Sequence, residues 1–178
     1  ALFATAAANA RCSHAVWVTG EGFQRVANDT QPPSAWGEIP LGGARSFEES
    51  HGLLPPRLRR QGIRIVISDL FWPGDPLPTL RKLTEGAAAV TLVQLLAPSD
   101  LEPPKPGNVQ LEDSETGETL SLYIDTTIQE QYRKTLQRLQ QSWNHAAQQT
   151  GAELVTLIAD NLQGSLRSLE ECRTLEPA

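Results

Sequence analysis

The chain has 178 residues, of which 21 are acidic and 15 basic, and a formal net charge of −6. Its length fits one domain with a hydrophobic core, so we expect a single domain over residues 1–178. The acidic balance argues against a nucleic-acid binder, because neutralising phosphates needs an excess of Lys and Arg. No apolar stretch reaches transmembrane length, and no signal peptide opens the chain. We therefore expect no membrane contact by this segment and a cytoplasmic location, with membrane association of the intact protein left open.

Two details of composition bear on the state of the chain. Cys12 and Cys172 lie far apart and neither belongs to a CxxC motif, so we interpret them as a reduced pair rather than a disulfide. Met is absent even at position 1, and residues 1–10 read as the second half of a helix. We therefore expect this chain to be a fragment.

Four elements are expected before residue 63. They are a helix from Ala1 to Ala10, a strand from Ala15 to Thr19, a brief edge strand from Phe23 to Ala27, and a helix that begins after Ser46. Ser46 and the two glutamates that follow Phe47 offer an N-cap and an acidic first turn for that second helix, which Pro55 and Pro56 break. A further helical turn should then lead to Gly62 as a C-cap. We interpret the basic cluster of this turn as a solvated helix end; its members are Arg57, Arg59, Arg60 and Arg64.

The most informative segment runs from Ile63 to Asp69, an apolar run that stops at a hydroxyl and a carboxylate. A strand that is apolar on both faces is typical of the centre of a parallel sheet covered by helices. Two later apolar runs also end at carboxylates, at Asp100 and at Asp160. Ligands gather beyond the carboxyl ends of parallel strands, so we expect Ser68, Asp69 and the later carboxylates to lie on one functional rim.

Strands and helices alternate through the rest of the chain. The expected elements are a helix from Pro78 to Glu85, a strand from Ala87 to Leu96, a hairpin of residues 109–113 and 118–124, a long helix opening at Asp125, a strand from Ala152 to Ala159, and a helix from Gln163 to about Arg173. The hairpin alternates apolar and polar residues like a half-buried ribbon. In the long helix, Thr127 and Glu130 are spaced as a capping box, and Gly151 is the expected end. This order predicts an α/β, Rossmann-like fold with a mostly parallel sheet flanked by helices and an added β-hairpin.

The chemistry of the rim has two readings. Ser68 and Asp69 offer the hard oxygen ligands that Mg²⁺ or Mn²⁺ prefers, but Asp69 also suits a simple cap of the next turn. Asp100 and Asp160 precede loops in which Asp is an ordinary turn residue. No Cys/His cluster has zinc spacing, and GxSxG, GxGxxG and Walker A motifs are absent, so the sequence gives catalysis no support.

Two tryptophans are candidates for contact with a partner. Trp36 and Trp72 stand in loops rich in Pro and Gly, and Trp72 follows closely on Asp69. An exposed aromatic beside a carboxylate suits a protein interface, whereas a buried one would anchor its own loop. Core packing explains Trp17 and Trp143.

From about Ile63 to Leu169 the chain resembles the carboxyl-terminal part of a von Willebrand factor A-like domain, and specifically the bacterial family called domain of unknown function 58. The matching segments are residues 66–70, 80–83, 89–100, 111–120, 132–133 and 158–161, with Gly151, Leu166 and Leu169. The hairpin Leu111-Glu112-Asp113-Ser114-Glu115-Thr116-Gly117-Glu118-Thr119-Leu120 is the most distinctive of them. The first third of the chain matches only loosely.

Domains of this kind commonly carry a metal-ion-dependent adhesion site, made of Asp-x-Ser-x-Ser after the first strand, a Thr from a later loop, and an Asp after the fourth strand. Asp69 matches the last of these by position. The Asp-x-Ser-x-Ser element is absent, and its strand would lie just before Ala1, so we expect a domain truncated at its amino-terminal strand. The loop Thr has no clear match; residues 42–46 occupy that region. The family is generally taken as non-enzymatic and is often encoded beside MoxR-type AAA ATPases.

The resemblance therefore implies an interaction or scaffold module rather than an enzyme. We expect a protein partner, for which a AAA ATPase is the candidate, to dock at the rim with or without Mg²⁺. In this reading Asp69 is the metal ligand, and Ser68, Trp72 and Asp100 are the partner contacts. The alternative is a Mg²⁺-dependent hydrolase or phosphoryl-transfer enzyme of Rossmann-like topology that uses Asp69, Asp100 and Asp160. A third reading is a structural remnant whose rim is empty.

Overall fold

The computed structural model describes residues 1–20, 22–39, 45–113 and 117–160, together with residues 164, 167 and 169. The chain divides into two compact units, Ala1–Leu58 and Arg59–Ala178. The prediction of a single domain over residues 1–178 stays a prediction. In the described part of the chain, no helix is both long and apolar enough to span a bilayer.

The first unit contains short elements close to those expected. They are helix α1 (Leu2–Asn9), strands β1 (Trp17–Gly20) and β2 (Gly22–Arg25), the 3-10 helix η1 (Pro33–Ala35) and helix α2 (Phe47–Leu53). Strands β1 and β2 pair as an antiparallel hairpin. Ser46 caps α2, and the side chain of Glu49 accepts a hydrogen bond from the backbone N–H of Ser46, which completes a capping box. The rings of Phe23 and Phe47 pack edge to face with their centroids 5.2 Å apart.

Trp36 anchors its own loop. Its side chain is buried, and its indole N–H donates to the backbone carbonyl of Gln31 at 2.9 Å. The alternative of an exposed aromatic at an interface is therefore wrong for Trp36, because a buried indole satisfies its donor inside the loop.

The predicted helical turn that ends at Gly62 is wrong. Helix α2 ends at Leu53, because two consecutive prolines remove backbone donors and push the residue before them out of the helical region, and residues 55–62 contain no helix. Gln61 instead forms a turn with a positive φ of 54° and donates its N–H to Gly86. Arg64 does not belong to a solvated end, since its guanidinium donates to the carbonyl of Leu83.

The second unit is built on a parallel sheet of three strands, β3 (Ile63–Ser68), β4 (Ala89–Leu96) and β7 (Glu153–Ile158), in the order β3-β4-β7. The prediction of an α/β protein with a parallel sheet and an added hairpin is confirmed. The predicted central position of residues 63–69 in the sheet is wrong for the described strands, since β4 lies in the middle of the order β3-β4-β7. Most of β4 is buried, whereas Ile63 and Ile67 of β3 are 72% and 57% exposed.

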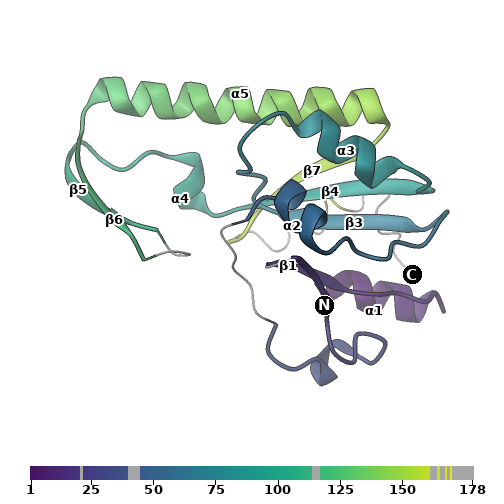
Figure 1. The fold of residues 1–178 in the computed structure, drawn as a ribbon. Coiled ribbons are helices and arrows are strands. Elements are labelled where there is room, and N and C mark those ends of the chain that lie inside the picture. Colours follow the sequence, from purple (N-terminus) through teal and green to yellow (C-terminus); the bar gives the residue numbers. More distant parts are fainter. Residues whose placement is uncertain are drawn as a thin grey trace. The chain divides into compact units, whose positions relative to one another are not determined.

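Helices α3 (Pro76–Thr84) and α5 (Thr126–Thr150) lie on the same face of this sheet (Figure 1). Two right-handed crossovers that step in the same direction along a sheet place their helices on one face, and this agrees with the strand order. Asp125 caps α5 by accepting from the N–H of Ile128, so the predicted capping box of Thr127 and Glu130 is wrong. Gly151 ends α5 in the left-handed conformation, as predicted.

Two elements follow β4 and precede α5 in the chain. They are helix α4 (Pro98–Leu101) and a hairpin of strands β5 (Gly107–Glu112) and β6 (Thr119–Ile124). The hairpin stands at the start of α5, away from the three-stranded sheet (Figure 1). Its pairing is as predicted. Its predicted half-burial holds near α5, where Val109 and Leu122 are half-buried and Ile124 is buried, but not at the outer end, where Leu111 and Leu120 are exposed. The predicted helix from Gln163 falls largely outside the described residues. Residues 164, 167 and 169 are helical, and Leu169 is buried.

Candidate functional site

The carboxyl ends of β3, β4 and β7 meet at one edge of the sheet because the three strands are parallel neighbours. Ser68 and Asp69 follow β3, Asp100 lies in the helix after β4, and Asp160 follows β7. The topology therefore directs the predicted residues to one edge. In the part of the chain that the structure describes, however, no three or more His, Cys, Asp or Glu side chains lie close enough together to hold a metal ion.

The strand-end turn, residues 68–72, is tightly organised from within. Leu70 has a positive φ of 60°, an unusual conformation for a residue with a branched side chain, and that side chain is fully buried. The hydroxyl of Ser68 accepts from the N–H of Leu70 at 3.1 Å, and Oδ1 of Asp69 accepts from the N–H of Phe71 at 3.1 Å. The alternative reading of Asp69 as a turn cap therefore holds for Oδ1.

Three other elements hold the turn from outside. From β4, the buried amide of Gln94 donates to the carbonyl of Asp69 at 3.0 Å, and Gln94 in turn accepts from Thr156 of β7 at 2.9 Å. From α5, the indole N–H of Trp143 donates to the carbonyl of Leu70 at 2.9 Å. These bonds fix two successive carbonyls, so Leu70 can be held in a backbone conformation that costs free energy elsewhere.

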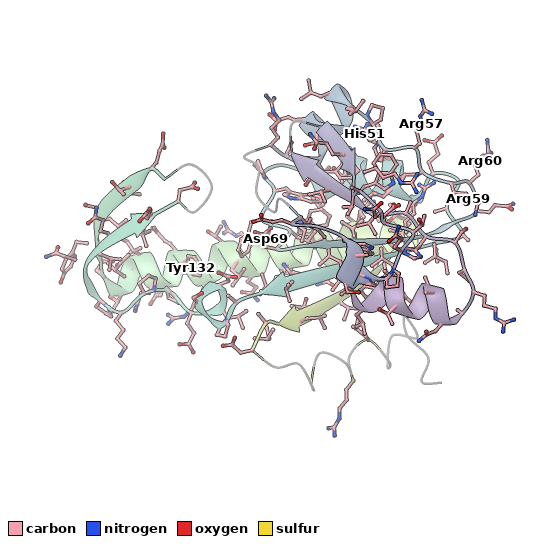
Figure 2. All side chains as sticks on the ribbon, turned by 90° about the horizontal axis from the view of Figure 1, so that it is seen from below. His51, Arg57, Arg59, Arg60, Asp69 and Tyr132 are labelled. Carbon is pink, nitrogen blue, oxygen red and sulfur yellow. The ribbon has the colours of Figure 1, made fainter. Side chains whose placement is uncertain are left out.

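The aromatic side chains of the turn differ in role. Trp72 is half-buried and packs edge to face against Trp143 with the ring centroids 5.4 Å apart, so it anchors the turn. Phe71 is 39% exposed and is the aromatic of this turn that faces solvent. Asp69, which precedes Leu70 and Phe71 in the turn, is also exposed (labelled in Figure 2). Sequence reasoning missed Phe71, and it missed Gln94, although a lone Gln inside the apolar run of residues 89–96 is a visible signal.

Asp100 serves its own segment. Its Oδ2 accepts from the backbone N–H of Ala97 at 2.7 Å at the start of α4, and its carbonyl accepts from the hydroxyl of Tyr132 at 2.9 Å. Burial first, and the negative charge of Asp100 second, raise the pKa of Tyr132 above its usual value. The phenol of Tyr132 therefore stays protonated and keeps its hydrogen bond to the carbonyl of Asp100. The role of Asp100 in partner binding stays a prediction.

The fold and the turn define a mixed α/β protein with a parallel sheet and a rigid turn at the carboxyl end of one strand. The family described as protein of unknown function DUF58 matches residues 35–143. The chain belongs to this family, and the predicted membership is confirmed.

The relatives of the chain include mycobacterial proteins. The chain is 30% identical over 105 residues to uncharacterized protein MAV169 of Mycobacterium avium, and the match covers 57% of this chain and 60% of that protein. It is 28% identical over 102 residues to uncharacterized protein Rv1480 of Mycobacterium tuberculosis, covering 57% of this chain and 32% of that protein. The chain thus spans less than two thirds of the length of these relatives. No solved structure matches the chain.

Proposed function

We propose that the chain is a non-enzymatic protein-interaction module with a von Willebrand factor A-like fold, whose partner is a MoxR-type AAA ATPase. The observation that supports docking at the rim is the strand-end turn. Hydrogen bonds from β4 and α5 hold its backbone, while the carboxylate of Asp69 stays exposed at its tip. A binding group that is held in place before the partner arrives costs less entropy to immobilise.

The carboxylate has the capacity for such a contact. Within the described residues, its hydrogen bonds to the N–H of Phe71 and the hydroxyl of Ser68 both involve Oδ1. Oδ2 therefore accepts from an Arg or Lys of the partner, and the exposed ring of Phe71 packs beside that contact. Among the described residues no three His, Cys, Asp or Glu side chains lie close enough together to hold a metal ion, so the docking is derived from the carboxylate of Asp69 itself.

Replacing Asp69 by asparagine should weaken binding of a MoxR-type ATPase about tenfold, because a charge-assisted hydrogen bond contributes roughly 1.5–3 kcal/mol. The shape of the turn should survive, since the Asn carbonyl oxygen still accepts from Phe71. Isothermal titration with the ATPase encoded in the same genome measures the affinity, and a thermal melt checks the fold.

The matched control is Asp160→Asn, which removes an exposed carboxylate after β7 at the same edge of the sheet. It should leave the affinity unchanged. Equal affinities for wild type and Asp69→Asn would refute docking at the rim. Turnover of generic phosphate or ester substrates that is lost in Asp69→Asn would support the rival hydrolase instead.

A further inference from the structure

The β5–β6 hairpin has one apolar and one polar side. Cross-strand pairing sets Val109 opposite Leu122 and Leu111 opposite Leu120, and alternation along each strand places these four side chains on the same side. We call these four residues the hairpin face. The opposite side carries Asn108, Gln110, Ser121 and Tyr123.

The outer half of the hairpin face is exposed. Leu111 and Leu120 are 42% and 62% exposed, although they form a directly opposed apolar pair. A shallow hollow of about 430 Å³ lies at this end of the hairpin. It is lined by the two leucines, Asp113 and Glu118, and by the pair Glu112 and Thr119, which alternation places on the opposite side. An opposed pair of exposed leucines with carboxylates at the same end of the hairpin has the composition of a contact surface.

The charge of the hairpin has a single sign. Residues 107–124 contain four acidic residues and no Lys, Arg or His. A partner segment that covers the leucines therefore binds more favourably if it carries positive charge at its margins, whereas an acidic partner segment is repelled.

The hairpin is attached at its root and reaches outward from it. Gln129 donates to the carbonyl of Pro104 at 2.8 Å, and Tyr132 donates to that of Asp100, so both bonds join the start of α5 to the segment before β5. An isolated pair of strands is marginally stable in water, and contact with another element would stabilise it. Two strands spaced about 4.8 Å apart present a strip of side chains about as wide as one helix.

We propose that the hairpin face docks a basic amphipathic helix of a partner protein. The leucine pair packs against the apolar stripe of that helix, and its Lys and Arg side chains flank the carboxylates of the hairpin end. This deepens the interaction module proposed above by naming a second contact surface, and it rests on that function. The hairpin face differs from the rim, where the contact is the carboxylate of Asp69 with the ring of Phe71 beside it.

The test uses the whole chain and two synthetic helical peptides with the same leucine stripe. The remaining positions are Lys in one peptide and Glu in the other. Fluorescence anisotropy should show saturable binding of the Lys peptide that weakens as salt rises, and much weaker binding of the Glu peptide. Leu120→Ser should weaken binding of the Lys peptide about tenfold, because it removes one buried aliphatic side chain from the contact. Leu111→Ser should have the same effect from the other strand.

Tyr123→Ser is the matched control, because Tyr123 is also 62% exposed but lies on the opposite side of the same hairpin. It should leave the affinity unchanged. Absence of saturable binding, equal binding of both peptides, or equal losses in Leu120→Ser and Tyr123→Ser would each overturn the proposal. Asp69→Asn should bind the Lys peptide like wild type. A loss there would move the peptide to the rim and overturn docking at the hairpin face, whereas failure of the ATPase titration alone would leave the hairpin result standing.

Discussion

Replacing Trp143 by alanine is expected to lower the free energy of unfolding of the second unit by about 4 kcal/mol, the range for removing a large buried aromatic side chain. Trp143 is 2% exposed, packs against Trp72, and donates its indole N–H to Leu70 inside the strand-end turn. The substitution leaves a cavity under the turn and leaves the buried carbonyl of Leu70 without its hydrogen-bond donor. Hydrogen exchange at the amides of β3, β4 and β7 measures the change in the unit to which Trp143 belongs.

Two variants separate the causes of that loss. Trp143→Phe keeps an aromatic ring but removes the N–H, so it should cost about 1–2 kcal/mol, mostly from the unsatisfied carbonyl of Leu70. Tyr123→Ala removes an exposed aromatic ring of the hairpin in the same unit and should leave amide exchange in the sheet unchanged. If Trp143→Ala exchanges like wild type, the indole does not support the turn, and the turn is not held rigid from α5.

The helices of this chain are largely predictable from local patterns. In α5 an apolar residue recurs every three or four positions up to Trp143, and Gly151 ends the helix in the conformation that favours glycine. Strand order is not local in this way. The apolar runs at residues 63–68 and 89–96 look alike in the sequence. Their partners alone decide that, among the described strands, β4 lies between two neighbours while β3 has one.

The strand-end turn was only half predictable. Ser68 and Asp69 follow an apolar run, which is a visible signal for a strand end. The left-handed conformation of Leu70 has no such signal, because Gly or Asn is the usual residue there. The bond between Gln94 and Thr156 joins residues 62 positions apart, and it depends on β4 and β7 being neighbours.

The hairpin illustrates a limit of alternation as evidence. Alternating apolar and polar residues predict that the two sides of the ribbon differ, and they do. Alternation does not say whether another element covers the apolar side. The acidic composition of residues 107–124 adds what alternation lacks, since it restricts which partner can cover that side.

Asp29 connects the segments of the first unit through its carboxylate. Its Oδ2 accepts from the N–H of Val16 at 2.8 Å and from Nε of Arg25 at 2.9 Å, and its Oδ1 accepts from Nη2 of Arg25 at 3.0 Å. The residue is 3% exposed. Burial alone would raise the pKa of Asp29, but the hydrogen bonds from Arg25 and Val16 and the charges of Arg25 and His14 outweigh it and lower the pKa below its usual value.

Asp29→Ala is accordingly expected to lower the free energy of unfolding of the first unit by about 2 kcal/mol at neutral pH, because it removes the hydrogen bonds of the carboxylate and leaves the N–H of Val16 without its acceptor, while the half-exposed Arg25 is solvated by water. A lowered pKa means that this stabilisation is complete above the unfolded value of about 3.9 and is lost as the pH falls through the folded value. Hydrogen exchange at the β1 and β2 amides should therefore differ between wild type and variant at neutral pH, and the difference should shrink as the pH falls below about 4 and through the folded pKa. Glu38→Ala, which removes an exposed carboxylate of the same unit, should follow wild type throughout. A difference between Asp29→Ala and wild type that stays constant down to pH 2 would show that shape, not charge, is what Asp29 contributes.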